Sequence, residues 1–159
     1  MPSQRSEKDA CDLLDADHKA VKKLFNAYDE LAGSKARGAA QKRLELARQI
    51  CQELTVHAQI EEEIFYPALR AAIKETDLLA EAEVEHASAK DLIAQIEALS
   101  EPDEKYDAKV KVLGEDIDHH VKEERNEIFP KARSARKLDL VAMRDELAAR
   151  KEELMGAMA

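Results

Sequence analysis

The sequence is poor in the residues that form loops and cross-links, and each shortage excludes a class of protein. Only 4 Gly and 4 Pro occur in 159 residues, and with abundant Ala, Leu, Glu, Lys and Arg this composition favours helix nearly throughout. Two cysteines, Cys11 and Cys51, are too few for a disulfide framework and are expected to be small buried residues in a reducing compartment. No apolar run approaches the roughly 18 residues of a membrane-spanning helix. The N-terminal "MPSQRSEKDA" is too polar for a signal peptide, so a cytoplasmic location is expected.

Several functional signatures are also lacking. The sequence contains no His-Glu-x-x-His protease motif, no glycine-rich phosphate loop and no Cys-x-x-Cys pair, which excludes the chemistries that these motifs perform. The formal net charge is −9 at pH 7. Because an acidic surface repels phosphate backbones, nucleic acid is not an expected partner.

Hydrophobic periodicity of the helical kind is abundant, and breakers divide it into segments. The capping-box-like "SEKD" at Ser6 to Asp9 predicts the start of a first helix, which "GSKARG" at 33–38 ends. A second helix is expected from about Ala39. Pro67 should kink or end this helix, because proline lacks the N–H of an intrahelical hydrogen bond.

Two more long helices and a C-terminal segment follow. Thr76 and Asp77 are the expected caps of the third helix. Pro102 lies near the start of the fourth helix, which extends to Pro130. A last amphipathic segment begins at about Lys137, and no segment shows the alternation of a strand.

These segments predict an all-α fold. Four amphipathic helices joined by short loops pack most simply as an antiparallel up-down four-helix bundle, here over residues 1–136. An additional C-terminal helix over residues 137–159 is expected to lie against the bundle or at an oligomer contact. The sequence leaves open whether the protein is a monomer or a homo-oligomer.

The two halves of the predicted bundle repeat each other. "HAQIEEEIFYP" (57–67) and "HVKEERNEIFP" (120–130) both place Glu four residues and Pro ten residues after a His. His18 and His86 both precede leucines at plus six and plus thirteen. Such a repeat predicts an approximate two-fold axis along the bundle, and a site on that axis would use paired ligands.

Six polar residues fall within the apolar stripes of these helices. A stripe covers roughly 0.3 of a helix circumference, so four histidines would all land there by chance about one time in a hundred. Burying the six without partners would cost several kcal/mol for each ionised carboxylate. A metal centre supplies the compensating charge. The six residues are His18, His57, Glu61, His86, His120 and Glu124.

Helical spacing allows these residues to share a centre. His57 and Glu61, four residues apart, lie on one face of their helix, as do His120 and Glu124. The pattern predicts two metal ions, each held by two histidines, with both glutamates bridging. Room remains for an oxo or hydroxo bridge and an exogenous ligand. Imidazole and carboxylate without thiolate suit iron, with manganese or zinc as possible substitutes, whereas a single structural zinc needs only four ligands.

Two neighbouring residues are alternative ligands. His119 competes with His120, but polar residues precede His119 on its helix face, whereas Ile117 precedes His120 by three, so His120 is preferred. Glu83 stands three residues before His86 and can also reach the centre, with a solvated glutamate as the alternative.

Other residues near the motifs are expected to have supporting roles. Glu62 and Glu63 continue onto the polar side of their helix and are interpreted as surface charges. Four aromatic residues should lie near the site, either as core packing or as the lining of a dry pocket for a diatomic ligand, to which Tyr66 can donate a hydrogen bond. These aromatic residues are Phe25, Phe65, Tyr66 and Phe129.

The ordered set "DADH", "HAQIEEEIFYP", "VEH" and "HVKEERNEIFP" resembles the hemerythrin-like HHE cation-binding domain over about residues 9–133. The resemblance implies a non-haem di-iron centre inside a four-helix bundle, and O₂ binding or sensing, iron handling, or reactions with peroxide or nitric oxide. Oxygen-carrying hemerythrins use a fifth histidine in a His-x-x-x-His pair on the third helix. Here Ala82 and Lys90 flank His86 at those distances, which opens a coordination position suited to redox turnover.

Three functions are therefore compatible with the sequence. The first is a di-iron protein that binds O₂ or a related small molecule for storage, delivery or sensing. The second is a di-iron oxidoreductase acting on peroxide or nitric oxide, so whether the protein is an enzyme stays open. The third is a metal-free helical interaction module in which the buried polar groups fix the register. A ferritin-like site would need two Glu-x-x-His motifs, and only "EVEH" at 83–86 fits.

Overall fold

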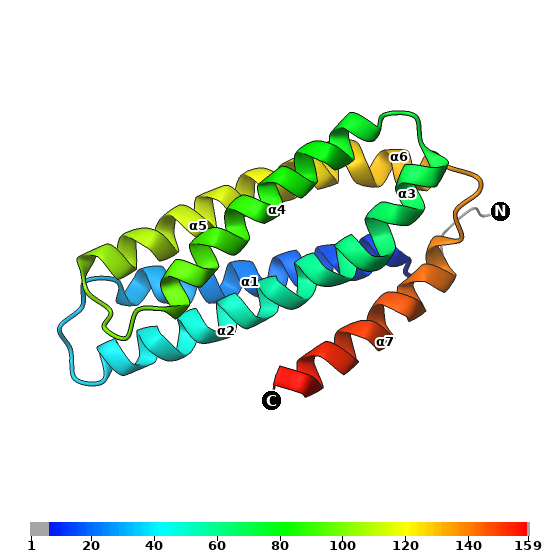
Figure 1. Ribbon diagram of the computed structural model, residues 1–159. Helices are drawn as coiled ribbons and strands as arrows, with labels where there is room; N and C mark the ends of the chain where they lie inside the picture. The colour runs from blue at the N-terminus through cyan, green and yellow to red at the C-terminus, as the bar shows by residue number, and fades with distance from the viewer. Residues whose placement is uncertain (1–6, 159) are drawn as a thin grey trace.

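The computed structural model describes residues 7–158, and Figure 1 shows them as a bundle of antiparallel helices. The turns from α1 to α2 and from α4 to α5 lie at one end of the bundle, and α3 and α6 lie at the other (Figure 1). The described residues contain no strand, and the predicted all-α up-down bundle with an additional C-terminal helix is confirmed. The four long helices are α1 (Ala10–Leu31), α2 (Ala39–Ile60), α4 (Thr76–Glu97) and α5 (Glu104–Glu123).

Two of the long helices continue through a π-helical turn into a short helix. In each turn a backbone N–H reaches back five residues, from Tyr66 to the Glu61 carbonyl and from Phe129 to the Glu124 carbonyl. The sequence predicts a kink or an end at Pro67. The structure places a wider turn just before this proline, where the helix changes direction, and the helix continues beyond it (Figure 1). The segments are η1 (Glu61–Phe65) with α3 (Tyr66–Ala72), and η2 (Glu124–Ile128) with α6 (Phe129–Ser134).

The helix starts differ from the predicted caps by a few residues. Asp9 is the N-cap of α1, where its side chain accepts a hydrogen bond from Asp12 N and its own N–H donates to the Asp12 side chain. This capping box replaces the predicted one, whose Ser6 lies outside the described residues. The N-cap of α4 is Glu75, one residue before the predicted Thr76, and its side chain makes no capping hydrogen bond.

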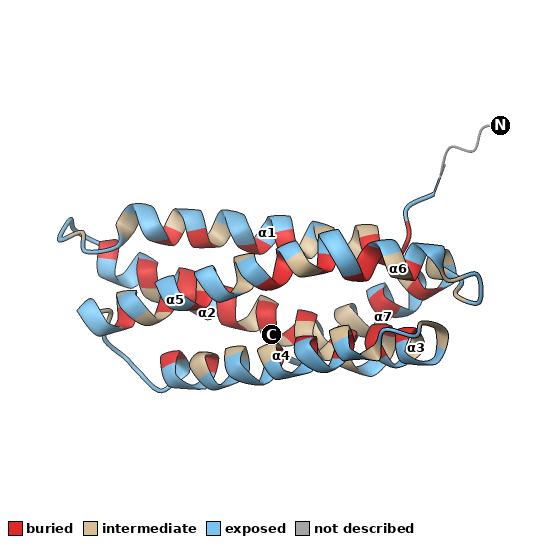
Figure 2. Ribbon diagram, turned by 90° about the horizontal axis from the view of Figure 1, so that it is seen from above, coloured by how far each residue is buried: buried red, intermediate tan, exposed pale blue. Residues whose placement is uncertain are grey.

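Two apolar clusters fill the bundle. The buried residues lie on the inward faces of the helices (Figure 2). The first cluster lies where α3, α6 and the C-terminal helix meet the bundle, and the second lies toward the α1–α2 turn. Along α1, His18 stands between Leu14 of the first cluster and Val21 of the second. The polar residues predicted from the sequence therefore form a layer between two apolar regions.

An ion pair between the buried Arg43 and the partly exposed Asp107 joins the helices at the end of the bundle near the α1–α2 turn. Arg43 Nη1 donates to both carboxylate oxygens of Asp107, at 2.8 and 2.7 Å. Tyr28 Oη donates to Asp107 Oδ1 at 2.6 Å, and the backbone N–H of Gly33 donates to Oδ2 at 3.0 Å. Gly33 has a φ of 74°, a left-handed conformation that favours glycine. One carboxylate on α5 thus joins α1, α2 and the turn between them.

The C-terminal helix α7 (Leu140–Met158) lies against α1, α2 and η1 (Figure 1). Met143 and Leu147 are buried in the first apolar cluster, which anchors this helix to the bundle. The division of the chain at residue 137 stays a prediction. Within the described residues, no helix combines the length and the apolar character needed to cross a membrane.

Candidate metal centre

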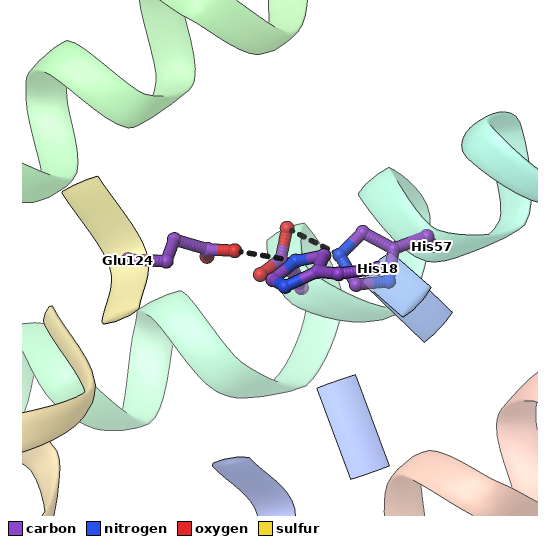
Figure 3. Close-up of side chains that lie close together, drawn as sticks. His18, His57 and Glu124 are labelled. Carbon is purple, nitrogen blue, oxygen red and sulfur yellow. Dashed lines mark ion pairs between the residues drawn. The ribbon is translucent and has the colours of Figure 1, made fainter. Parts of the chain in front are cut away.

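The six residues selected from the sequence meet in the polar layer. Glu61 and Glu124 are fully buried, and the four histidines are only 5–8% exposed. Each of the four long helices provides one histidine, and each π-turn begins with one of the glutamates. Figure 3 shows His18 and His57 side by side, with the carboxylate of Glu124 directed toward them.

The histidines form two pairs of nearly identical geometry. The rings of His18 and His57 are 4.9 Å apart between centroids with an interplanar angle of 61°. The rings of His86 and His120 are also 4.9 Å apart, at 62°. The repeat in the sequence thus appears in the interior as two equivalent halves, one from α1 and α2 and one from α4 and α5.

Glu61 faces one histidine of each pair. Its Oε1 lies 3.3 Å from His57 Nε2 and 3.1 Å from His86 Nε2. Burial alone would raise the pKa of Glu61, but the charge of His57 and the polar interactions with Glu124, His57 and His86 together outweigh burial and hold this pKa well below its usual value. An ionised carboxylate therefore lies between the two histidine pairs.

Glu124 occupies the equivalent position on the opposite side. Its Oε1 lies 2.9 Å from His18 Nε2 and 3.7 Å from His120 Nε2. Its Oε2 accepts a hydrogen bond of 2.9 Å from the Tyr66 hydroxyl. Burial and the negative charge of Glu61 raise the pKa of Glu124. Two buried carboxylates facing each other therefore differ in their affinity for a proton.

Several atoms directed into this centre have no hydrogen-bond partner among the described residues. The short contacts between these imidazoles and carboxylates lack the angles of hydrogen bonds. Each unsatisfied buried group costs about 1–3 kcal/mol, and imidazole and carboxylate lone pairs are the donors that divalent iron, manganese and zinc accept. The residues present therefore fit a metal centre. The atoms are Nε2 of His18 and His57, both carboxylate oxygens of Glu61, and Oε1 of Glu124.

An outer ring of carboxylates orients the histidines. Each Nδ1 faces one carboxylate oxygen, so the opposite Nε2 points inward, as in the carboxylate–histidine pairs of metal sites. Glu62, interpreted from the sequence as a surface charge, belongs to this ring and is only partly exposed. The four pairs are His18 with Asp15 (3.2 Å), His57 with Asp17 (2.9 Å), His86 with Glu62 (2.7 Å) and His120 with Glu85 (2.7 Å).

The alternative ligands lie outside the centre. The His119 side chain is 70% exposed and pairs with Glu123 at 2.8 Å, at a surface group that also includes Glu85. Glu83 is exposed and accepts a hydrogen bond of 2.7 Å from Arg70. Lys90 donates to Glu62 at 2.6 Å and therefore points toward the outer ring. His86 is the one imidazole that α4 contributes to the centre.

A cavity of about 220 Å³ adjoins the histidines on the side of the second apolar cluster. The four aromatic residues lie elsewhere: Phe129 stacks on His18, Phe65 packs between Tyr66 and Phe129, and Phe25 is buried in the second cluster. Besides the histidines, apolar side chains from all four long helices line the cavity, namely Val21, Leu54, Ala89, Ile93 and Ile117.

Comparisons with known proteins agree with this arrangement. The model of the hemerythrin HHE cation-binding domain family matches residues 9–132. A DNA nickase of Nostoc sp. strain PCC 7120 is 32% identical over 132 residues, and the match covers 83% of this chain but only 36% of the nickase. A solved HHE cation-binding domain-containing protein of Mycobacterium kansasii is similar with a TM-score of 0.76 and 24% identity, over 95% of this chain and 90% of that one.

Proposed function

This chain belongs to the hemerythrin HHE cation-binding domain family, and from that premise we propose that it is a non-haem di-iron protein that binds O₂ or a related small molecule. Its task would be storage, delivery or sensing in the cytoplasm, a location compatible with the two free, buried cysteines. Each iron would be held by one histidine pair, with Glu61 and Glu124 as shared ligands. When bound, the metals supply open coordination positions at which a small ligand can bind.

The observation that carries this proposal is the convergence of unsatisfied atoms. Six side chains from four helices and two π-turns meet in one buried region. Four of them have nitrogen or oxygen atoms without a hydrogen-bond partner among the described residues, namely His18, His57, Glu61 and Glu124. A bundle that used these groups only to fix helix register would be expected to pair them with one another by hydrogen bonds. Two divalent cations would accept these lone pairs and would more than offset the negative charge of the two carboxylates.

The surrounding residues suit a small uncharged ligand. The cavity has apolar walls next to the histidines and charged residues such as Asp17, Glu85 and Lys151 elsewhere in its lining, and it leaves space for a small molecule. The Tyr66 hydroxyl holds Glu124 through its Oε2, and the outer carboxylates fix the imidazole planes. These residues keep the ligand set rigid, which favours reversible binding over loss of the metals.

Metal analysis combined with optical spectroscopy tests the proposal. The purified protein should contain two irons per chain, and the reduced form should show a visible absorption change on oxygenation that reverses on deoxygenation. The His57→Ala variant should lose iron, whereas His119→Ala, which removes an exposed imidazole, should retain it. A stable protein without metal would instead support the helical interaction module. Binding of manganese or zinc in place of iron would reject the iron assignment, and rapid irreversible oxidation would reject reversible O₂ binding.

A second candidate is a di-iron oxidoreductase acting on peroxide or nitric oxide. This candidate is favoured because α4 contributes a single imidazole to the centre. Lys90 is turned toward Glu62, so a coordination position is left for a substrate. Turnover should then exceed that of free iron, measured as O₂ evolved from peroxide or as nitric oxide consumed. The His119→Ala variant should keep this activity and His57→Ala should lose it. Equal rates in these two variants would reject the candidate.

A further inference from the structure

The C-terminal helix is linked to the candidate metal centre through Asp17. Lys151 Nζ of α7 donates to Asp17 Oδ1 at 2.5 Å. The other oxygen of this carboxylate, Oδ2, lies 2.9 Å from His57 Nδ1. A helix outside the bundle is therefore linked by two consecutive contacts to one of the six candidate ligands.

This link differs from those of the other outer carboxylates. Asp15 accepts a hydrogen bond from Arg125 at 2.6 Å, and Glu62 accepts one from Lys90 at 2.6 Å. Both of these cations belong to the bundle, to η2 and α4. Glu85 faces only His119 and His120 among the described basic residues. Asp17 alone relies on α7, so the two equivalent halves of the centre differ in what supports them.

Burial restricts the movement of the Asp17 side chain. The Asp17 side chain is 13% exposed, and with one oxygen facing His57 and the other Lys151, its carboxylate has little freedom to rotate. Without Lys151, one oxygen in this poorly hydrated place would lose its charged donor, and turning toward water would separate Asp17 from His57. The position of the His57 ring thus depends on α7.

Anchoring of α7 is independent of this contact. Met143 and Leu147 are buried in the first apolar cluster. The adjacent Arg150 pairs with Glu63 at 2.8 Å, and Glu63 touches no histidine in the described structure. Lys151 and Arg150 therefore both join α7 to the bundle, yet only Lys151 acts on an aspartate that holds a histidine.

We propose that α7 is a positioning element of the metal centre, in which Lys151 fixes Asp17, Asp17 fixes His57, and the seating of the C-terminal helix sets the metal affinity of the His18–His57 half. The inference rests on the proposed di-iron function. Lys151 and Met155 also line the cavity next to the histidines, so the same helix closes one side of the chamber that a small ligand would enter.

Three variants of the full chain test this role. Lys151→Gln removes the cation, Lys151→Arg keeps a cation, and Arg150→Gln removes the neighbouring ion pair of α7 as the matched control. Anaerobic titration with Fe²⁺ against a chromophoric chelator gives the affinity of each of the two ions. Lys151→Gln should weaken one ion by about tenfold, the lower end of the effect of losing an outer partner of a metal ligand. The other ion should be unaffected, Lys151→Arg should largely restore affinity, and Arg150→Gln should match the wild type.

A second measurement needs no metal. In the metal-free protein, the hydrogen-bonded Nδ1 proton of His57 should give a downfield NMR signal, assigned by its loss in His57→Gln. This signal should broaden or vanish in Lys151→Gln and persist in Arg150→Gln. If it is unchanged in Lys151→Gln, or lost equally in both, the positioning role is rejected. If the wild type fails to bind Fe²⁺, the di-iron function is rejected, while the NMR comparison still decides whether α7 holds His57.

Discussion

Glu61 and Glu124 illustrate how burial and charge act together on single residues. Both are fully buried, but the pKa of Glu61 is lowered and that of Glu124 is raised, because two carboxylates that face each other in a dry interior do not both ionise readily. His57 compensates for the Glu61 charge. Burial would lower the pKa of His57, but Glu61 and Asp17 outweigh burial and raise it well above its usual value.

The raised pKa of His57 predicts how stability depends on pH in the metal-free protein. A pKa raised by folding contributes stability that is fully present below the unfolded value of about 6.5. This contribution is lost as the pH rises through the folded pKa. Urea unfolding of metal-free protein should therefore show a His57 contribution that declines above about pH 6.5. The contribution is measured as the difference between wild type and His57→Gln, with His119→Gln as the control. A difference that grows with pH would contradict the direction of this shift.

Tyr66 should contribute through its hydroxyl rather than its ring. Tyr66→Phe keeps the apolar packing but leaves Glu124 Oε2 without its hydrogen bond of 2.9 Å. The metal-free protein should lose about 1–3 kcal/mol of unfolding free energy. A double-mutant cycle with Glu124→Leu, which has no acceptor, isolates the interaction between the two residues. A coupling energy near zero would show that the hydroxyl acts on some other group.

At the scale of helices, the sequence pattern predicts the candidate ligands, but it does not predict the residues that hold these ligands in place. His57 and Glu61 follow from the i, i+4 spacing, which one helix alone determines. The partner of His57 does not, because Asp17 is adjacent to His18 in sequence but crosses from α1 to meet His57 on α2. The π-turns also escape prediction, since proline at plus six from each glutamate is compatible with a kink, an end or a wider turn.

The Asp107 cluster gives a prediction at the scale of helix packing. Asp107→Asn would leave the Arg43 guanidinium, whose side chain is 7% exposed, without its ionic partner. Asp107 is partly exposed, but Arg43 is buried, and leaving a buried charge without its partner costs up to about 3–5 kcal/mol. The control is Asp118→Asn, whose pair with Lys22 is half exposed and should contribute less than about 1 kcal/mol. Urea midpoints measure both. Equal effects of the two substitutions would refute the structural role of Asp107.

For the whole molecule, the sequence was sufficient for the fold class because the periodic stripes and short loops leave few ways to pack. The sequence left open whether α7 packs against the bundle or forms an oligomer contact, because apolar residues such as Met143 and Leu147 are compatible with either surface. Three-dimensional packing decides this choice. The division of the core by a polar layer follows from the histidine positions, but only the structure shows the two clusters separately.

Removal of the metal should lower the thermal stability of the entire domain. A ligand that binds only the folded state, at 100 times its dissociation constant, adds about 2.7 kcal/mol. For a chain of this size that corresponds to a rise in Tm of about 5–10 °C. Thermal unfolding before and after chelation measures this difference in Tm. In the Glu61→Gln variant, chelation should change Tm only a little. A Tm independent of metal in the wild type would contradict a centre shared by four helices.

The layer of histidines and glutamates has a consequence for how the domain can diverge. Side chains on its two sides, such as Leu14 and Phe25, belong to different clusters, so substitutions there share no neighbours and their energetic effects should add. Each end of the molecule can exchange its hydrophobic residues without disturbing the other. Only the residues of the layer of histidines and glutamates must be substituted together.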